Sequence, residues 1–327
     1  MNFDFDAAVT APFRMQPGLR RRAPGAPALT PLAAGSRHQR EKLAVLSAFA
    51  TQALLQAPGF DAGPALATLC STAAAEHPQH WQWDGRSATA TRLGVRVHLA
   101  DGRVEQTAGG VFGLGDELPR CVALQPPAWR LATLLALTFA EDLAIVDATS
   151  ARIPWLAVAL PSHWAPEDKV GRPFAEVHAP VADGELLRRA GEGLVALVCG
   201  SERWERFVWT VTDHPRLHAH PQRVPHERWA QPALATWAEG LPRAWFRSEH
   251  QTFVPVPGQR QAVFTIGVEV QTLPQAVCSR ARALRLAEAV ASMSPAVLAY
   301  RGLTPVRDAL LQWLAARAAA LAGAQAP

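Results

Sequence analysis

The chain has 327 residues, of which 49% are hydrophobic and 18% are charged, so it can bury a large core and does not have the composition of a disordered chain. The formal net charge is only +4, and the only lysines are Lys42 and Lys169, so most of the positive charge is scattered arginine. A nucleic-acid binder is expected to concentrate basic residues in a stripe. We therefore expect no nucleic-acid partner.

The cysteines and the N-terminus point to a cytoplasmic protein. The four cysteines lie far apart, which excludes a zinc ribbon, a ferredoxin-type cluster or a thioredoxin-type pair built from local spacing. We expect them to be thiols in a reducing cytosol. The N-terminus lacks the apolar region of a signal peptide, and the longest apolar stretch, 131–140, is too short to span a bilayer. These features predict a soluble, cytoplasmic protein without a membrane partner.

The predicted elements mix helices with antiparallel strands, after a Pro- and Gly-rich arm over residues 1–37. Apolar residues at helical spacing predict helices over 39–56, 66–75, 129–143, 183–199 with Asp183 as the N-cap, 274–292 and 305–322. Alternation predicts strands over 93–99, 104–107, 154–160, 206–212, 243–256 and 261–270. Asp101-Gly102 and Pro257-Gly258 are expected to form hairpin turns.

This order predicts an α+β fold in three segments. Residues 1–79 form an arm and helices, 80–273 a core, and 274–327 helices that pack on the core. Within the core, strands precede helices and three further strands follow. That order is compatible with a PAS-like antiparallel sheet with inserted helices, flanked by N- and C-terminal helices. Periodicity alone fits other α+β folds as well.

The segment from Leu160 to Val181, LPSHWAPEDKVGRPFAEVHAPV, is the most informative in the chain. His178 precedes Ala179-Pro180, which restricts the local backbone. A neutral imidazole there can ligate haem iron while its second nitrogen bonds to a backbone carbonyl. Lys169 and Arg172 can pair with haem propionates. A lone histidine in a turn can equally be structural.

This segment resembles the haem-binding alpha subunit of haem-dependent oxidative N-demethylase, whose family shows P-S-x-W-x-P-x-x-K-x-G running into I-H-x-P-V. Further matches follow the family's order over about residues 12–300. They are Phe13-Arg14-Met15 with Gly18-Leu19-Arg20, Glu41-Lys42-Leu43, Glu141-Asp142-Leu143, Arg247 with Glu249, Gln251 and Thr252, and Phe264-Thr265-Ile266.

The resemblance implies a PAS-like fold turned from sensing to catalysis, haem b with a protein axial ligand, and oxidative N-demethylation of a small secondary amine with O2. It implies that electrons come from separate flavin and iron–sulfur subunits and that formaldehyde passes to a folate-binding subunit. In this chain His178 would be the iron ligand, with His163 and His250 in reserve. Lys169, Arg172 and Trp164 would bind the cofactor. The chain itself shows no flavin or nicotinamide motif, so we expect it to depend on a partner reductase.

The sequence departs from the family at positions expected to line the pocket. Val208 replaces an Asn, His250 replaces an Arg, and Gly267-Val268-Glu269 replaces Arg-Thr-Tyr. Haem binding is therefore expected to carry over better than the substrate or the catalysis. The alternatives are a PAS-like haem-binding sensor, a catalytically divergent homologue, or a paralogue without haem.

The strand over 243–256 supplies the expected catalytic residues, Arg247, Glu249 and Gln251. Alternate residues of a strand share one face, here with Trp245 and Phe253. If that face lies over the haem, Glu249 attracts a protonated amine and Arg247 holds Glu249 or a propionate. The alternative is a solvated face with cross-strand charge pairs.

A second candidate site is weaker. His218-x-His220 could ligate a metal in an extended loop, or belong to a solvated Pro-rich loop over 213–228 that also carries His214 and His226.

Overall fold

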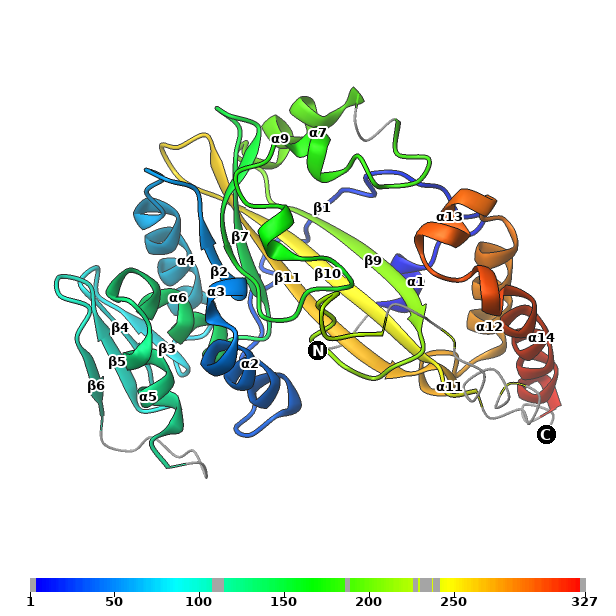
Figure 1. The fold of residues 1–327 in the computed structure, drawn as a ribbon, viewed down its shortest axis with the longest axis horizontal. Coiled ribbons are helices and arrows are strands. Elements are labelled where there is room, and N and C mark those ends of the chain that lie inside the picture. The colour runs from blue at the N-terminus through cyan, green and yellow to red at the C-terminus, as the bar shows by residue number, and fades with distance from the viewer. Residues whose placement is uncertain are drawn as a thin grey trace.

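The structure is a computed structural model that describes residues 4–107, 115–185, 189–225, 229, 237 and 242–323. Within these residues, helices and two antiparallel sheets confirm the predicted α+β class. The larger sheet has seven strands in the order β1-β9-β10-β11-β7-β8-β2, and the smaller has four in the order β3-β4-β5-β6. The large sheet crosses the molecule, with the small sheet at one end and the C-terminal helices at the other (Figure 1).

The bounds of the elements follow the chain. The strands are β1 Arg20–Arg21, β2 Leu54–Gln56, β3 Trp81–Trp83, β4 Ser87–Ala90, β5 Val95–His98, β6 Val104–Gln106, β7 Asp142–Asp147, β8 Arg152–Ala157, β9 Trp204–Thr212, β10 Trp245–Pro255 and β11 Gln261–Thr272. The helices are α1 Phe5–Ala8, α2 Arg37–Ala48, α3 Ala50–Ala53, α4 Gly63–Glu76, α5 Glu117–Leu124, α6 Pro127–Thr138, η1 Pro166–Asp168, α7 Phe174–Val177, α9 Gly191–Val198, α11 Leu273–Ala276, α12 Arg280–Ala291, α13 Pro295–Tyr300, η2 Thr304–Val306 and α14 Arg307–Gly323.

The long hairpin of β10 and β11 confirms its prediction and forms the middle of the large sheet. Gly258 has φ 72° in its turn, a left-handed conformation that glycine adopts without a Cβ clash. Glu249 lies between Val208 of β9 and Val268 of β11. The predicted helix 66–75, the strands at 154–160 and 206–212, and the hairpin at Asp101-Gly102 also correspond to elements of the structure.

Two large apolar cores lie at different ends of the large sheet. The larger joins α4 and α6 to both sheets through side chains such as Leu69, Leu134 and Val263. The second lies beneath α12 and α14 and includes Phe246 and Leu286. Together they fix the large sheet between two helical layers (Figure 1).

Two predicted helices end earlier than expected, and a third lacks its predicted N-cap. The helix predicted over 39–56 ends at Ala48, because Leu54–Gln56 pair with β8 as a strand. The helix predicted over 129–143 ends at Thr138, because Asp142 and Leu143 begin β7. Asp183 is not a helix N-cap: its φ is 55°, and its carboxylate accepts a hydrogen bond from Ser294.

The C-terminal region is also divided differently. The helix predicted over 274–292 is two helices, α11 and α12, and α13 with η2 precedes α14. The three-segment division of the chain stays a prediction, and β1 and β2 from the first segment pair within the large sheet. In the part of the chain that the structure describes, no helix is long and apolar enough to cross a membrane.

Candidate functional site

Residues 160–181 lie over one face of the large sheet, which we call the site face and define by Arg206, Arg247, Glu249 and Gln251. Arg206 is the register partner of Gln251, and Val208 that of Glu249. Arg247 Nε donates to Ser162 Oγ at 2.8 Å, which ties the segment to the sheet. The predicted row on β10 therefore faces the family-like segment.

Arg247 is an anchor of this segment. Its side chain is 1% exposed, and its guanidinium donates to Ser162 Oγ and to four backbone carbonyls, those of Leu160, Pro161, Arg216 and Leu217. The contacts to the carbonyls are 2.8–3.3 Å long. Burial lowers the pKa of Arg247 to about 10, and nearby carboxylates oppose that shift. The guanidinium thus joins residues 160–162 to residues 216–217.

A buried ion pair fixes the start of the same segment. Lys42 Nζ lies 3.2 Å from Asp142 Oδ1, and both side chains are buried. Asp142 Oδ2 accepts from the Leu160 backbone N–H at 2.6 Å. Glu41 accepts from the N–H groups of Leu217 and His218. The residues that match the family at Glu41-Lys42, Asp142 and Arg247 therefore all hold the two loops that flank the site face.

His178 follows α7 at the far end of the segment. Its Nδ1 lies 2.8 Å from the Phe174 carbonyl oxygen, and the two rings stack with centroids 3.9 Å apart. Burial lowers the pKa of His178 to about 4; the Phe174 hydrogen bond raises it, and Arg206 and Lys169 lower it. Within the described residues, His178 Nε2 makes no hydrogen bond. The imidazole is neutral at physiological pH, and one nitrogen remains for a ligand.

The helix α9 supports the ring that holds His178. A Cβ at Gly191 would lie 2.9 Å from Phe174 Cδ1, so this glycine allows α9 to approach α7 closely. Phe174 also packs against a cluster that includes Val195 of α9 and Phe253 of β10. The His178 turn is thereby packed between α9 and the large sheet.

The other expected cofactor residues occupy three different environments. Lys169 Nζ donates to the Val177 carbonyl at 3.0 Å, next to His178, and burial lowers its pKa. Trp164 is half-buried and packs against Ala144, Leu156 and Val158 beneath the segment. Arg172 is exposed. Lys169 and Trp164 therefore support the segment from within, and Arg172 lies at its surface.

Glu249 and Gln251 interact directly. Gln251 Nε2 donates to Glu249 Oε2 at 2.5 Å, and Glu249 is 8% exposed. Burial lowers the pKa of Arg206, while Glu249 and then Tyr300 raise it. Arg206 Nε is buried and has no hydrogen-bond partner among the described residues. The site face thus holds a buried carboxylate beside a cation with an unused donor.

Sequence patterns did not place Arg206 in the site, nor Tyr300, whose charge acts on the pKa of Arg206. Arg206 carries a signal that could have been used, since it lies two residues before Val208, where the family carries an Asn. Tyr300 has none, because α13 was not predicted and no motif includes it. Its contribution depends on how α13 folds back on β9.

Of the two reserve histidines, His163 belongs to residues 160–181, whereas His250 does not. His250 points to the opposite face of the sheet, where its Nε2 lies 2.8 Å from Glu205 Oε2 and its ring stacks on Phe207. His163 has φ 63°, and its ring lies 5.1 Å from that of His214. His218 Nδ1 bonds to the Ala159 carbonyl, and His220 Nε2 lies 3.1 Å from Glu167. His226 lies outside the described residues.

Neither histidine cluster forms a ligand set. Among the residues that the structure describes, no three His, Cys, Asp or Glu side chains are arranged to hold a metal ion. The four cysteines are all free thiols.

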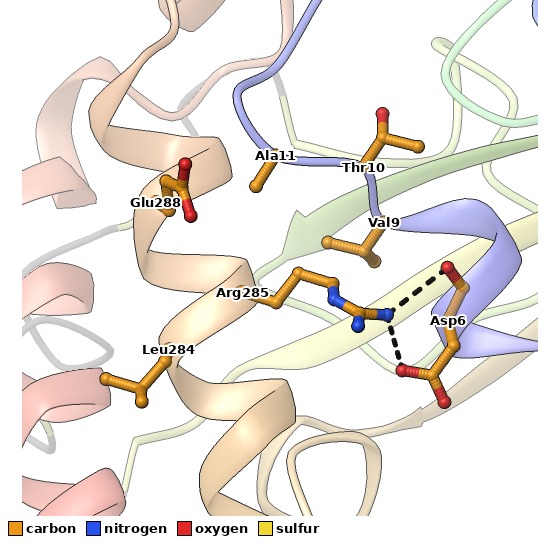
Figure 2. A pocket seen from close by; sticks show the side chains of 7 residues that line it. All are labelled: Asp6, Val9, Thr10, Ala11, Leu284, Arg285 and Glu288. Carbon is orange, nitrogen blue, oxygen red and sulfur yellow. Dashed lines mark hydrogen bonds and ion pairs between the residues drawn. The ribbon is translucent and has the colours of Figure 1, made fainter.

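A separate surface hollow of about 460 Å³ lies between the N-terminal arm and α12 (Figure 2). Arg285 crosses it to contact the Asp6 carboxylate at 2.6 Å. The residues that line it are Asp6, Val9, Thr10, Ala11, Leu284, Arg285 and Glu288. None of them belongs to the site face or to residues 160–181, so the hollow is not part of the candidate site. The ion pair between Asp6 and Arg285 joins α1 to α12 there.

The chain matches the profile of one known family. The profile of the family described as "Haem-dependent oxidative N-demethylase, alpha subunit-like" matches residues 65–311. That range contains residues 160–181, the whole of β9, β10 and β11, and Tyr300. Because the match covers well over half of the 327 residues, the chain belongs to the haem-dependent oxidative N-demethylase alpha subunit-like family.

Proposed function

We propose that this chain is the haem b-binding subunit of a cytoplasmic enzyme that removes a methyl group oxidatively from a small secondary amine, using O2. The observation that carries the proposal is His178. Its Nδ1 is held by a backbone carbonyl, and its pKa of about 4 keeps the ring neutral, which is the state that ligates iron. The family description supplies the haem dependence and the reaction class.

The kinds of side chain that a haem requires are present on and beside residues 160–181. A haem needs an axial nitrogen, apolar walls and cations for its propionates. His178 supplies the nitrogen, and Phe174, Trp164 and Phe264 supply apolar surface. Arg206 has a buried Nε without a hydrogen-bond partner among the described residues, and its positive charge lowers the pKa of His178. It therefore suits a propionate better than Arg172, which is exposed. Lys169 keeps further N–H groups beside its bond to Val177.

The chain's own residues would then divide the remaining work. When bound, the haem supplies the iron at which O2 is activated. Glu249 attracts the protonated amine, because a carboxylate in a buried site is little screened. Gln251 holds the Glu249 carboxylate in place. Arg247 is a positioning residue that fixes both flanking loops.

Electrons must come from partner subunits. The chain has no flavin or nicotinamide motif and no local cysteine spacing for an iron–sulfur cluster. The alpha-subunit description of the family fits a multi-subunit enzyme. We infer that flavin and an iron–sulfur cluster reside on a partner reductase, and that a folate-binding subunit takes up the formaldehyde.

A PAS-like haem-binding sensor or catalytically divergent homologue is the second candidate function. The observation that favours it is the pair Val208 and Val268, which flank Glu249 on the site face where family members carry Asn and Thr. Two polar side chains that could contact a substrate are therefore absent from this face. A sensor needs haem binding but not turnover.

One experiment separates these functions. The protein as isolated should show a Soret band, and with O2, NADH and a flavin/iron–sulfur reductase it should release formaldehyde from dimethylamine. A Soret band without formaldehyde would identify a sensor or divergent homologue. Absence of haem binding would identify a paralogue without haem. Steady NADH-driven turnover by the isolated chain would contradict the need for a partner.

A further inference from the structure

The backbone of Phe174 fixes which ring nitrogen of His178 is free. A carbonyl oxygen can only accept a hydrogen bond, so the 2.8 Å contact between His178 Nδ1 and the Phe174 carbonyl places the ring hydrogen on Nδ1. In a neutral imidazole the lone pair then lies on Nε2. The same carbonyl accepts the His178 backbone N–H at 3.1 Å, so the backbone and the side chain of His178 share one anchor.

The Phe174 ring adds a second constraint, on the plane of the imidazole. The two residues are four positions apart along α7 and its C-cap, a spacing that brings side chains together on one helix face. Their rings are stacked, with centroids 3.9 Å apart and planes 27° apart. The hydrogen bond thus fixes one edge of the imidazole, and the stack fixes its face.

The helix α9 holds the Phe174 ring in its place, and it lies beside α7 (Figure 1). Gly191, the first residue of α9, is buried, and a Cβ there would lie 2.9 Å from Phe174 Cδ1 and 3.6 Å from Cε1. Carbon atoms do not approach as closely as 2.9 Å, so any side chain at Gly191 must displace the ring. The Phe174 N–H donates to the Ala151 carbonyl at 2.8 Å, which ties the backbone of Phe174 to the turn between β7 and β8.

These contacts assign a role to Phe174. Groups that hold the second nitrogen of a metal-binding histidine fix both its tautomer and its ring orientation. We propose that Phe174 is the positioning residue of the iron ligand: its carbonyl selects His178 Nε2 as the ligating nitrogen, its ring sets the imidazole plane, and Gly191 lets α9 hold that ring. This inference rests on the proposed function, in which His178 binds haem iron.

The first test needs no haem. NMR of haem-free protein with labelled histidine reads which ring nitrogen of His178 carries hydrogen, and His178→Gln identifies the signals. Wild type should show hydrogen on Nδ1 and ring protons shifted upfield by the Phe174 face. Phe174→Leu should keep the hydrogen on Nδ1, because the carbonyl remains, and lose the upfield shift. Phe253→Leu removes a ring from the same apolar cluster and should leave the His178 signals unchanged. Hydrogen on Nε2, or an upfield shift that survives in Phe174→Leu, would overturn the proposal.

The second test uses haem-loaded His178→Gly, in which added imidazole can replace the missing side chain. Adding Phe174→Leu should weaken imidazole binding, followed in the Soret region, about two- to tenfold, as expected for the loss of an aromatic stack. Adding Gly191→Ala should also weaken it, whereas adding Phe253→Leu should not. Equal affinities in all four proteins would overturn the proposal. A wild-type protein without a Soret band would instead refute the proposed function, and the NMR signals would still decide whether Phe174 orients His178.

Discussion

The two faces of the strands β9 and β10 carry similar residue types but use them differently. On the face opposite the site face, which we call the arm face, Glu205 accepts from Arg20 at 2.8 Å and contacts His250 at 2.8 Å. Thr252 and Thr265 share a hydrogen bond of 2.6 Å. On the site face, Glu249 has Gln251 as its hydrogen-bond partner, and Arg206 Nε is without one among the described residues.

The difference teaches where to look for a ligand. Buried polar groups in folded proteins are normally hydrogen-bonded, so an unused buried donor needs an explanation. The N-terminal arm covers the arm face and supplies Arg20 there, over the Phe207 ring. Residues 160–181 cover the site face and bring His178, whose second nitrogen stays available. Buried polar atoms without a hydrogen-bond partner among the described residues occur on both faces, since Arg22 Nε and Ser248 Oγ on the arm face also lack one. What distinguishes the site face is a histidine with an available ring nitrogen, so this is the face to test for a cofactor.

The largest expected effect is the loss of haem from His178→Ala. If His178 is the axial ligand, the variant should lose the Soret band or change it greatly. His250→Ala is the matched control, because His250 lies on the arm face and pairs with Glu205. The absorbance spectra of both purified variants decide the matter. An unaltered spectrum in His178→Ala would remove the distinction between the faces, and His163→Ala would then be the next variant.

The next effect concerns the anchor of the site segment. Arg247→Lys should lower the free energy of unfolding by about 3 kcal/mol, because lysine cannot reproduce five directed hydrogen bonds and leaves buried carbonyls unpaired. Denaturant unfolding of the haem-free protein measures it. Arg172→Lys is the control at an exposed position, with an expected change within about 0.5 kcal/mol. Equal stability of the two variants would show that Arg247 does not anchor the loops.

Sequence patterns predicted which residues of β10 share a face better than they predicted the contacts of those residues. The alternation on β10 predicted that Arg247, Glu249 and Gln251 share a face, because side chains in a strand alternate irrespective of what packs above them. The role of Arg247 was beyond reach, since its acceptors lie about 30 and 85 residues away in sequence. Local patterns carry no information on such contacts.

The helix boundaries show the same limit. Leu54 fits a helical stripe, yet it lies in β2 and pairs with Ala157 of β8. Strand pairing in the folded protein outweighs a weak local preference for helix. The charge at Lys42 gave no sign of burial, because its partner Asp142 is known only from the fold. The helix α13 was not predicted, because it depends on the cap at Ser294 and on the contact of Arg301 with β9.

A smaller effect is expected at the substrate carboxylate. Glu249→Gln should raise the apparent KM for dimethylamine about tenfold or more, since a charge-assisted hydrogen bond is replaced by a neutral one. The Soret band should stay nearly unchanged, because Glu249 is not the proposed iron ligand. Steady-state kinetics with the reductase supplied provide the measurement. Unchanged amine binding with reduced stability would make the row on β10 structural and move the substrate pocket elsewhere.

The smallest effect is a pH dependence on the arm face. Burial lowers the pKa of His250 from 6.5, although Glu205 opposes this, and Arg22 and Arg20 add to the lowering. Below pH 6.5 the unfolded chain therefore binds a proton that the folded chain does not, so stability falls as the pH falls toward the folded pKa. His250→Phe keeps the stack on Phe207 and should reduce that slope by at most about 1.4 kcal/mol per pH unit. The measurement is the free energy of unfolding of both proteins across this pH window. Parallel curves would contradict the prediction, because His250 would then be protonated equally in the folded and unfolded states. The arm face would in that case be no more closed to solvent than the site face.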